Sequence, residues 1–349
     1  MNILLFSCHE ILEANLINLF LGLGHNVFSM GAFHSNSRGT GIRPEIPNFN
    51  PDPRLATVYL TGSKDNVPQE LIEWSHCIVM MHNAPSESHP QPWLANNWNK
   101  FKKAKKPVIW YSIGQSTGYV EESLHKFRKE GLKIVRYSPK ETNIPNFAGV
   151  DATIRFSIDP ADFELYEGNI ARIVNVSQAM FGGGTVPSRG DHMNLKEFKG
   201  VVEGFDWKVF GPNNENATEH DGGILSYEDL KSMLKFNRVY MYVGTRPASY
   251  TLGGMEAMCA GIPIVSIGPS LGDSIYKDQK TFEMHELIGE SGKAGFWSDN
   301  IDDLRKYCKM LVEDAELAKE VGAAGRLKAI QYFGKDLISK QWMDFFLQL

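Results

Sequence analysis

Short apolar runs alternate with helical patterns at the start of the chain. Residues 2–8 form an apolar run of the length expected for a buried parallel strand, and apolar positions in residues 11–23 recur at helical spacing. Gly24 stands where a left-handed residue commonly ends a helix, and residues 26–30 form a second apolar run. This order predicts a β-α-β unit with parallel strands and a right-handed crossover.

The alternation continues in two series. In the first, further strands are expected at residues 77–81, 108–113, 132–137 and 152–156, with a helix at 93–106. In the second, strands are expected at 172–176, 207–210, 239–243 and 262–267, with helices at 195–203, 227–234, 253–260, 301–312, 315–332 and 335–347. Residues 34–53 are dense in Gly, Pro, Asn and Ser and predict a long loop.

Two such series predict an α/β protein with two Rossmann-like, doubly wound domains. We place an N-terminal domain at residues 1–158, a linker at 159–169, a C-terminal domain at 170–332 and a final helix at 333–349. Ligands of parallel sheets bind at the carboxyl ends of the strands, so the cleft between the domains is the expected site.

The composition narrows the choice of partners. Apolar residues make up 42% of the 349 residues, and the formal net charge is −5. This acidic balance offers no general attraction for nucleic acid, and we expect at most peripheral contact with a membrane. The chain begins without a basic leader and has no run long enough to span a membrane, which favours a cytoplasmic location. The four cysteines form no C-x-x-C pair and are expected to be reduced.

The segment at residues 239–268 carries the strongest chemical signal. A buried run ends in a polar loop, and Gly253 and Gly254 then open a short helix. Amides at a helix start have no partner inside the helix and favour an anion such as phosphate. Glycines let a ligand approach the backbone, and Glu256 is placed to accept hydrogen bonds from ribose hydroxyls. The alternative is an ordinary βαβ turn in which the glycines serve tight packing.

The same segment resembles the donor-binding signature of retaining GT-B glycosyltransferases, the family 4-like enzymes of glycogen-synthase and mannosyltransferase type. Residues 256–265 read Glu-Ala-Met-Cys-Ala-Gly-Ile-Pro-Ile-Val, Thr245-Arg246 stands at the family's Ser-Arg, and Tyr250-Thr251-Leu252 at its Phe-Gly-Leu turn. The resemblance implies two Rossmann-like domains facing a cleft, C-terminal helices, and transfer of a sugar from a nucleotide-sugar donor to an acceptor hydroxyl with retained configuration.

The resemblance also implies roles for individual residues on the donor side. The amides of Thr251 and Leu252, with Gly253, would hold the diphosphate, and Glu256 would bind the ribose. Arg246 is assigned to the donor side as well. The family's first glutamate, which contacts the transferred sugar, is replaced here by Ala248, which leaves the identity of the sugar and the strength of catalysis open.

Four other positions complete the predicted donor site. Arg189 and Lys196 are candidates for the cations that meet the donor phosphates, the alternative being that both are ordinary surface residues. Asn213 follows a strand end, and Ile224 precedes the next helix, where the resemblance places contacts with the base.

Candidates in the first domain follow the ends of its strands. His82 is the only catalytic candidate and otherwise a surface or capping histidine. Gly114 and Gln115 are assigned to the sugar side, and His9 and Glu10 to the acceptor, unless they only cap the next helix. The absence of a D-x-D motif predicts no metal requirement and no cofactor, since the nucleotide-sugar is a substrate.

Three other functions stay open at this stage. The basic run at residues 100–106 with two nearby tryptophans could contact nucleic acid, although its spacing is typical of the solvated face of a helix, and some GT-B enzymes act on a modified DNA base. A sugar-nucleotide epimerase would share the donor site. A non-catalytic nucleotide-sugar-binding subunit would explain Ala248. The main prediction is transfer to an acceptor glycan, glycolipid or other hydroxyl compound.

Overall fold

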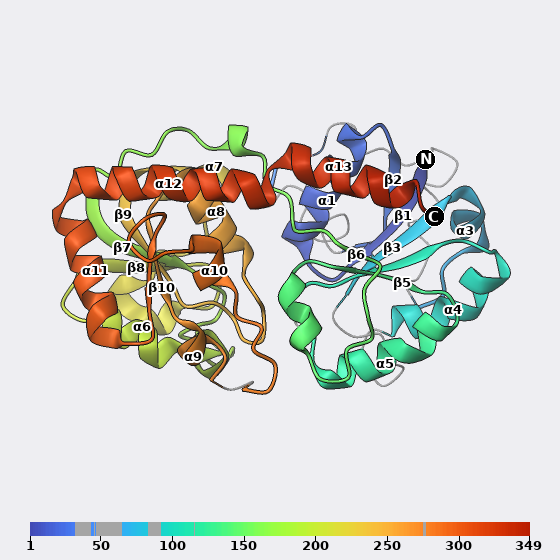
Figure 1. The fold of residues 1–349 in the computed structure, drawn as a ribbon, viewed down its shortest axis with the longest axis horizontal. Helices are drawn as coiled ribbons and strands as arrows, with labels where there is room; N and C mark the ends of the chain where they lie inside the picture. The colour runs from blue at the N-terminus through green and yellow to red at the C-terminus, as the bar shows by residue number, and fades with distance from the viewer. Residues whose placement is uncertain (32–42, 45, 47–64, 83–91, 115, 275–276) are drawn as a thin grey trace. The chain divides into compact units, whose positions relative to one another are not determined.

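The computed structural model describes residues 1–31, 43–44, 46, 65–82, 92–114, 116–274 and 277–349. It divides into two compact units, one made of Met1–Ser157 with Lys335–Leu349 and the other of Ile158–Gly334. Each unit is a Rossmann-like α/β structure with strands inside and helices around them (Figure 1). The predicted fold class is confirmed.

The first unit contains a six-stranded parallel sheet in the order β2-β1-β3-β4-β5-β6. Its strands are β1 Asn2–Ser7, β2 Asn26–Ser29, β3 Cys77–Met81, β4 Val108–Tyr111, β5 Lys133–Arg136 and β6 Ala152–Thr153. Its helices are α1 Glu10–Gly22, α3 Gln69–Trp74, α4 Trp93–Lys103, α5 Gly118–Lys129 and α13 Lys335–Phe346.

Both faces of this sheet are covered, which is why its strands are apolar at nearly every position. On one face, Phe6 packs against Trp93 and Phe101 of α4, with ring centroids 6.5 and 6.4 Å away. On the other face, the ring centroid of Tyr111 lies 5.2 Å from that of Trp342 in α13. The last helix of the chain is therefore part of the core of the first unit.

The second unit contains a five-stranded parallel sheet in the order β11-β10-β9-β7-β8. Its strands are β7 Ile170–Val176, β8 Trp207–Phe210, β9 Asn237–Tyr242, β10 Ile264–Ile267 and β11 Phe296–Ser298. Its helices are α6 Leu195–Val202, α7 Tyr227–Phe236, α8 Leu252–Ala260, α9 Pro269–Gly272, α10 Met284–Ile288, α11 Ile301–Glu313 and α12 Ala315–Phe333.

Most predicted elements are confirmed within a few residues, and the differences have local causes. Helix α5 was not predicted because charged residues dominate it, although Val120, Leu124 and Phe127 turn toward the core. Helix α4 ends before the predicted residue because Lys105 adopts a left-handed conformation with φ of 53°. Helix α3 was also missed, and the loop predicted at 34–53 lies almost wholly outside the described residues.

The segment that follows Ile158 is held against the second unit. Ile158 N donates to Phe333 O at 2.9 Å. The guanidinium of Arg326 in α12 donates to Pro160 O at 2.8 Å and to Phe163 O at 3.0 Å. The residues expected to form a linker thus accept hydrogen bonds, through their own main-chain carbonyls, from the Arg326 side chain of α12.

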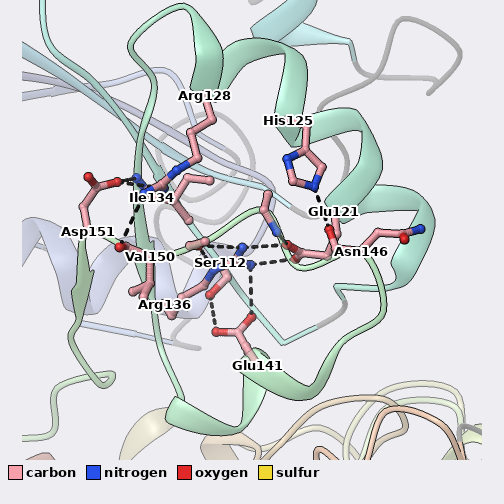
Figure 2. Close-up of polar contacts among 12 residues, drawn as sticks. Ser112, Glu121, His125, Arg128, Ile134, Arg136, Glu141, Asn146, Val150 and Asp151 are labelled. Atoms are coloured by element: carbon pink, nitrogen blue, oxygen red, sulfur yellow. Dashed lines mark hydrogen bonds and ion pairs between the residues drawn. The ribbon is translucent and has the colours of Figure 1, made fainter.

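A buried polar network lies at the ends of β4 and β5 in the first unit (Figure 2). Arg136 donates to both carboxylate oxygens of Glu121, at 2.7 and 2.6 Å, and to Gly149 O at 3.2 Å. Glu141 Oε2 accepts from Ser112 Oγ at 2.7 Å, but its Oε1 lies 3.9 Å from Arg136 Nη1 and accepts no hydrogen bond within the described chain. One buried cation therefore faces two buried carboxylates.

Burial raises the pKa of Glu141 from 4.5 to about 7, although Arg136 and Ser112 act in the opposite direction. At a pH between these two pKa values, Glu141 keeps its proton in the folded protein but loses it in the unfolded chain. The resulting stabilisation is complete below about pH 4.5 and is lost as the pH rises through about 7.

We predict that Glu141→Gln, which mimics the protonated acid, raises the thermal unfolding midpoint relative to the wild type more at pH 8 than at pH 5. The measurement is a series of thermal melts at pH 5, 6, 7 and 8 on both proteins. Glu122→Gln, on the exposed face of α5, serves as the control and should show no such trend. A difference between E141Q and wild type that stays constant with pH would contradict the prediction.

Candidate functional site

The second sheet has one position where its strand order reverses. The chain leaves β7 toward β8 and returns to β9 on the other side of β7. In open parallel sheets the crevice at such a reversal, outside the carboxyl ends of the strands, is the usual ligand site. Here it lies above the ends of β7 and β9. A Cβ atom added to Gly253 would stand 3.5 Å from Val176 O, so the start of α8 lies against the end of β7.

The start of α8 presents main-chain donors at this crevice. Thr251 is the N-cap with φ of −120° and ψ of 159°, and the first bond inside the helix runs from Met255 N to Thr251 O at 3.2 Å. The amides of Leu252, Gly253 and Gly254 precede that bond and have no carbonyl within the helix. The Thr251 amide is already used, because it donates to the Tyr242 hydroxyl at 3.0 Å.

Two tyrosines of β9 support this helix start from below. Tyr240 and Tyr242 are each 1% exposed. The Tyr240 hydroxyl accepts from Val176 N at 3.3 Å, as the Tyr242 hydroxyl does from Thr251 N. Burial raises the pKa of both phenols well above its usual range, so both stay neutral. The two-residue spacing on a strand was visible in the sequence, but their role was not predicted.

Gly253 and Gly254 allow the helix to approach these rings. A Cβ at position 253 would stand 2.7 Å from the Tyr240 hydroxyl oxygen, and one at 254 would stand 2.7 Å from the ring of Tyr242. Both glycines therefore serve helix–strand packing, which was the alternative raised from the sequence. Close approach by a ligand remains a prediction.

Glu256 lies one turn further along α8 and is 4% exposed. Its negative charge contributes to the raised pKa of Tyr240, which places it near the same helix–strand contact. Its assignment to the ribose stays a prediction. Ala248 lies in the preceding loop, where its amide donates to Thr245 O at 2.7 Å.

The predicted cations flank the start of α6. Arg189 lies at the entry to the short turn Gly190–Met193, Lys196 is the second residue of α6, and both are exposed. Asn194, between them, is buried, and its Nδ2 donates to Val243 O at 2.7 Å. This bond joins the loop after β7 to the end of β9, so the segment from Arg189 to the start of α6, which carries both cations, is held at the candidate crevice.

Arg246 is buried rather than open to the crevice. Its Nε, Nη1 and Nη2 donate to Gly272 O at 3.1 Å, Asp191 O at 2.9 Å and Leu271 O at 2.6 Å. The guanidinium donors that were assigned to the donor side are engaged by main-chain carbonyls. The sequence carried no signal for this arrangement, because its partners lie far away along the chain.

The two positions assigned to the base lie on neighbouring segments. Gly211 N donates to Gly223 O at 2.8 Å and Gly222 N to Val209 O at 2.8 Å, so residues 221–223 run beside β8. Asn213 follows β8 and has φ of 61°. Ile224 follows residues 221–223 and has 65% of its surface exposed.

Asn214, which was not predicted, holds the loop beside Asn213 in place. It is fully buried, and its Nδ2 donates to Ser177 O at 2.7 Å and to Gly211 O at 3.1 Å, while its Oδ1 accepts from Phe181 N at 3.1 Å. It thereby connects the loops that follow β7 and β8. Its place directly after a strand and a Gly-Pro turn was the available signal.

In the first unit, the residues assigned to the acceptor side also follow strand ends. The strand order reverses between β1 and β3, and His9 and His82 follow these two paired strands. His82 is 1% exposed, with its ring 4.6 Å from that of Trp93. Gly114, after β4, has φ of 87°, and Gln115 lies outside the described residues.

His9 is the N-cap of α1, directly before Glu10, and its Nδ1 accepts from Leu12 N at 3.3 Å. Burial lowers its pKa to about 4, assisted by the Arg43 cation. A helix N-terminus also disfavours a cation. A neutral ring that accepts through Nδ1 carries its proton on Nε2. His9 can therefore donate a hydrogen bond to a ligand oxygen, but is a poor base near neutral pH.

Among the described residues, no group of three or more His, Cys, Asp and Glu side chains is placed to hold a metal ion. No described helix combines the length and apolar character needed to cross a bilayer.

We predict that Gly253→Ala destabilises the second unit by about 1–3 kcal/mol, because the new methyl group overpacks against the Tyr240 hydroxyl. Tyr240→Phe removes that oxygen, so the double variant should be less destabilised than the sum of the two single variants. Gly254→Ala meets the Tyr242 ring instead and should gain no relief from Y240F. Denaturant unfolding of the wild type, the three single variants and the two double variants measures these differences, and strict additivity for G253A and Y240F would contradict the packing described here.

Comparison with known proteins adds a structural likeness. No family model matches the sequence, and no curated protein matches it. HepE from Anabaena, solved with UDP and glucose, has a TM-score of 0.67 at 14% identity, with 100% of both chains covered. Sucrose-phosphate synthase from Thermosynechococcus elongatus has a TM-score of 0.66 at 12% identity, with 100% of this chain and 98% of that chain covered. A glycosyltransferase from Rickettsia africae has a TM-score of 0.65 at 13% identity, with 99% of this chain and 98% of that chain covered. These similarities show that the chain has the GT-B fold.

Proposed function

We propose that the protein is a glycosyltransferase that transfers a sugar from a nucleoside diphosphate sugar to an acceptor hydroxyl. The observation that carries the proposal is the start of α8, which brings three amides without helix partners to the strand-order reversal of the second sheet. A UDP-sugar is the first candidate donor, since HepE was also solved with UDP-glucose.

In the proposed mechanism the nucleoside diphosphate is the leaving group and is held at the start of α8. The amides of Leu252, Gly253 and Gly254 donate hydrogen bonds to the leaving diphosphate and stabilise the negative charge that grows on it as the glycosidic bond breaks, and Arg189 and Lys196 add positive charge. Main-chain and side-chain donors thus take the role that a divalent cation has in other transferases, which is the basis for proposing a metal-independent reaction. Retention of configuration rests on the signature at residues 256–265.

The remaining assignments follow from placement and resemblance. Glu256 binds the ribose, and Asn213 and Ile224 lie on either side of the space for the base. On the acceptor side, the neutral His9 donates from Nε2 and orients an acceptor oxygen, while it does not remove the acceptor proton. The acceptor is a glycan, a glycolipid or another hydroxyl compound.

A second candidate function is favoured by one residue. Ala248 cannot offer a carboxylate to the transferred sugar, and a nucleotide-sugar-binding subunit without transferase activity needs none. Its donor site would use the same amides and the same Glu256. The two candidates therefore differ in turnover and not in donor binding.

We predict that UDP or another nucleoside diphosphate raises the thermal unfolding midpoint of the full chain without added metal. A ligand at 100 times its dissociation constant stabilises by about 2.7 kcal/mol, which a melt resolves readily. The panel contains UDP, GDP and ADP, the matching sugar derivatives and the free nucleosides as controls. The nucleosides should act weakly because they lack phosphates. No shift with any diphosphate would refute the proposed donor site.

We also predict that Glu256→Gln weakens nucleotide binding about tenfold, since a charge-assisted hydrogen bond to ribose is lost. Titration calorimetry with UDP measures the effect, and Glu320→Gln on the exposed face of α12 is the control. Unchanged binding by E256Q would remove Glu256 from the site.

A separate measurement of turnover distinguishes the candidate functions. Release of UDP from a UDP-sugar in the presence of acceptor separates a transferase from an epimerase and from a binding subunit.

A further inference from the structure

We infer that Arg246 is a positioning residue that holds together the three loops around the proposed donor site, and that it does not contact the donor. The inference concerns the site of the proposed function and rests on it for its effect on a ligand. The sequence had assigned Arg246 to the donor itself, so the two roles make different predictions.

The place of Arg246 in the sheet explains how one side chain reaches three loops. It follows β9, which lies between β7 and β10 in the sheet. Its Nη1 donates to Asp191 O in the loop after β7, at 2.9 Å. Its Nε and Nη2 donate to Gly272 O and Leu271 O, at 3.1 and 2.6 Å, at the end of the short helix after β10. The central loop is thus tied to both of its neighbours.

Two further hydrogen bonds strengthen the connection to the loop after β7. The main-chain amide of Arg246 donates to His192 O at 2.7 Å. In the opposite direction, Asn194 Nδ2 of the segment after β7 donates to Val243 O, directly after β9, at 2.7 Å. The segment that carries Arg189 and Lys196 is therefore fixed to the loop that leads into α8 by both main-chain and side-chain bonds.

An arginine suits this position better than a lysine. The guanidinium is a planar fork whose donors point in several fixed directions, whereas an ammonium group is a point charge on a flexible stem. A cation is also favourable beside the last carbonyls of a helix, which have no partner inside it. With three carbonyls as partners and 9% of its surface exposed, Arg246 has little left to offer a phosphate.

Arg238 provides a matched control within the same unit. It is also 9% exposed, and it also donates to main-chain carbonyls, of Gly168 at 2.6 Å and of Val312 at 2.8 Å. It is the second residue of β9 and so lies at the amino end of that strand, away from the proposed site. Arg→Lys at either position removes the same kind of bonds and keeps the charge.

The first experiment measures hydrogen–deuterium exchange in full-length wild type, Arg246→Lys and Arg238→Lys, without ligand. We expect faster exchange in R246K for peptides covering residues 187–196 and 268–274, and no change there in R238K. Unchanged exchange in R246K would overturn the inference whatever the protein binds, because the loops would not depend on the side chain.

The second experiment measures UDP affinity by calorimetry in a double-mutant cycle. We expect R246K to weaken UDP binding about tenfold in the wild-type background, and less than about twofold when Arg189 and Lys196 are both replaced by Gln. R238K should lower the melting temperature while leaving UDP affinity unchanged.

The outcomes separate the inference from the proposed function. Equal weakening by R246K in both backgrounds, with loop exchange unchanged, would indicate direct contact with UDP and overturn the inference, while the donor site would stand. Wild-type UDP affinity in R246K would also overturn it. Absence of UDP binding by the wild type would count against a UDP donor alone, and the exchange experiment would still decide the role of Arg246.

Discussion

The contact between helix α8 and strand β9 is the constraint on which the proposed site depends. Two adjacent glycines let the helix start lie against two tyrosine rings, and the buried hydroxyls accept hydrogen bonds from Val176 N and Thr251 N. A buried hydroxyl or amide left without a partner would cost roughly 1–3 kcal/mol. The same packing therefore satisfies the buried polar groups and places the free amides of α8 above the end of β7.

The use of buried arginines at strand ends is common to both units. Arg136, at the end of β5, binds Gly149 O and the carboxylate of Glu121. Arg246, after β9, binds only carbonyls. In each case one side chain joins separate segments at the carboxyl edge of a parallel sheet: Arg136 joins α5 to the loop at Gly149, and Arg246 joins the segments after β7 and β10. Removing one partner of a buried pair such as Arg136–Glu121 typically costs about 3–5 kcal/mol, so such arginines constrain the loops strongly.

The donor chemistry proposed for the second unit relies on main-chain groups more than on side chains. The amides at the start of α8 are available whatever side chains follow, whereas the position occupied by Ala248 offers no carboxylate. Recognition of a phosphate and recognition of a sugar are thereby separated. A phosphate needs only oriented N–H donors and positive potential, while a sugar needs specific partners for its hydroxyls.

The amino-acid sequence by itself determined the alternation of strands and helices, the two-domain α/β class and, within one residue, the helix start predicted at Gly253 and observed at Leu252. These follow from periodicity and from glycine and capping signals that act over a few residues. The sequence also brought out the segment 256–265 and with it the resemblance to glycosyltransferases. It assigned Arg189, Lys196 and Arg246 to the donor side, with Arg189 and Lys196 as the candidates for the phosphates.

Only the tertiary structure decided which of these residues are open to a ligand. Arg189 and Lys196 are exposed, whereas Arg246 is enclosed by carbonyls from segments up to 55 residues away along the chain. It also assigned α13 to the core of the first unit and gave Asn214, Tyr240 and Tyr242 their supporting roles. The physical reason is that burial and hydrogen-bond partners at a sheet edge come from loops that are distant in sequence, and local patterns do not record which loops meet.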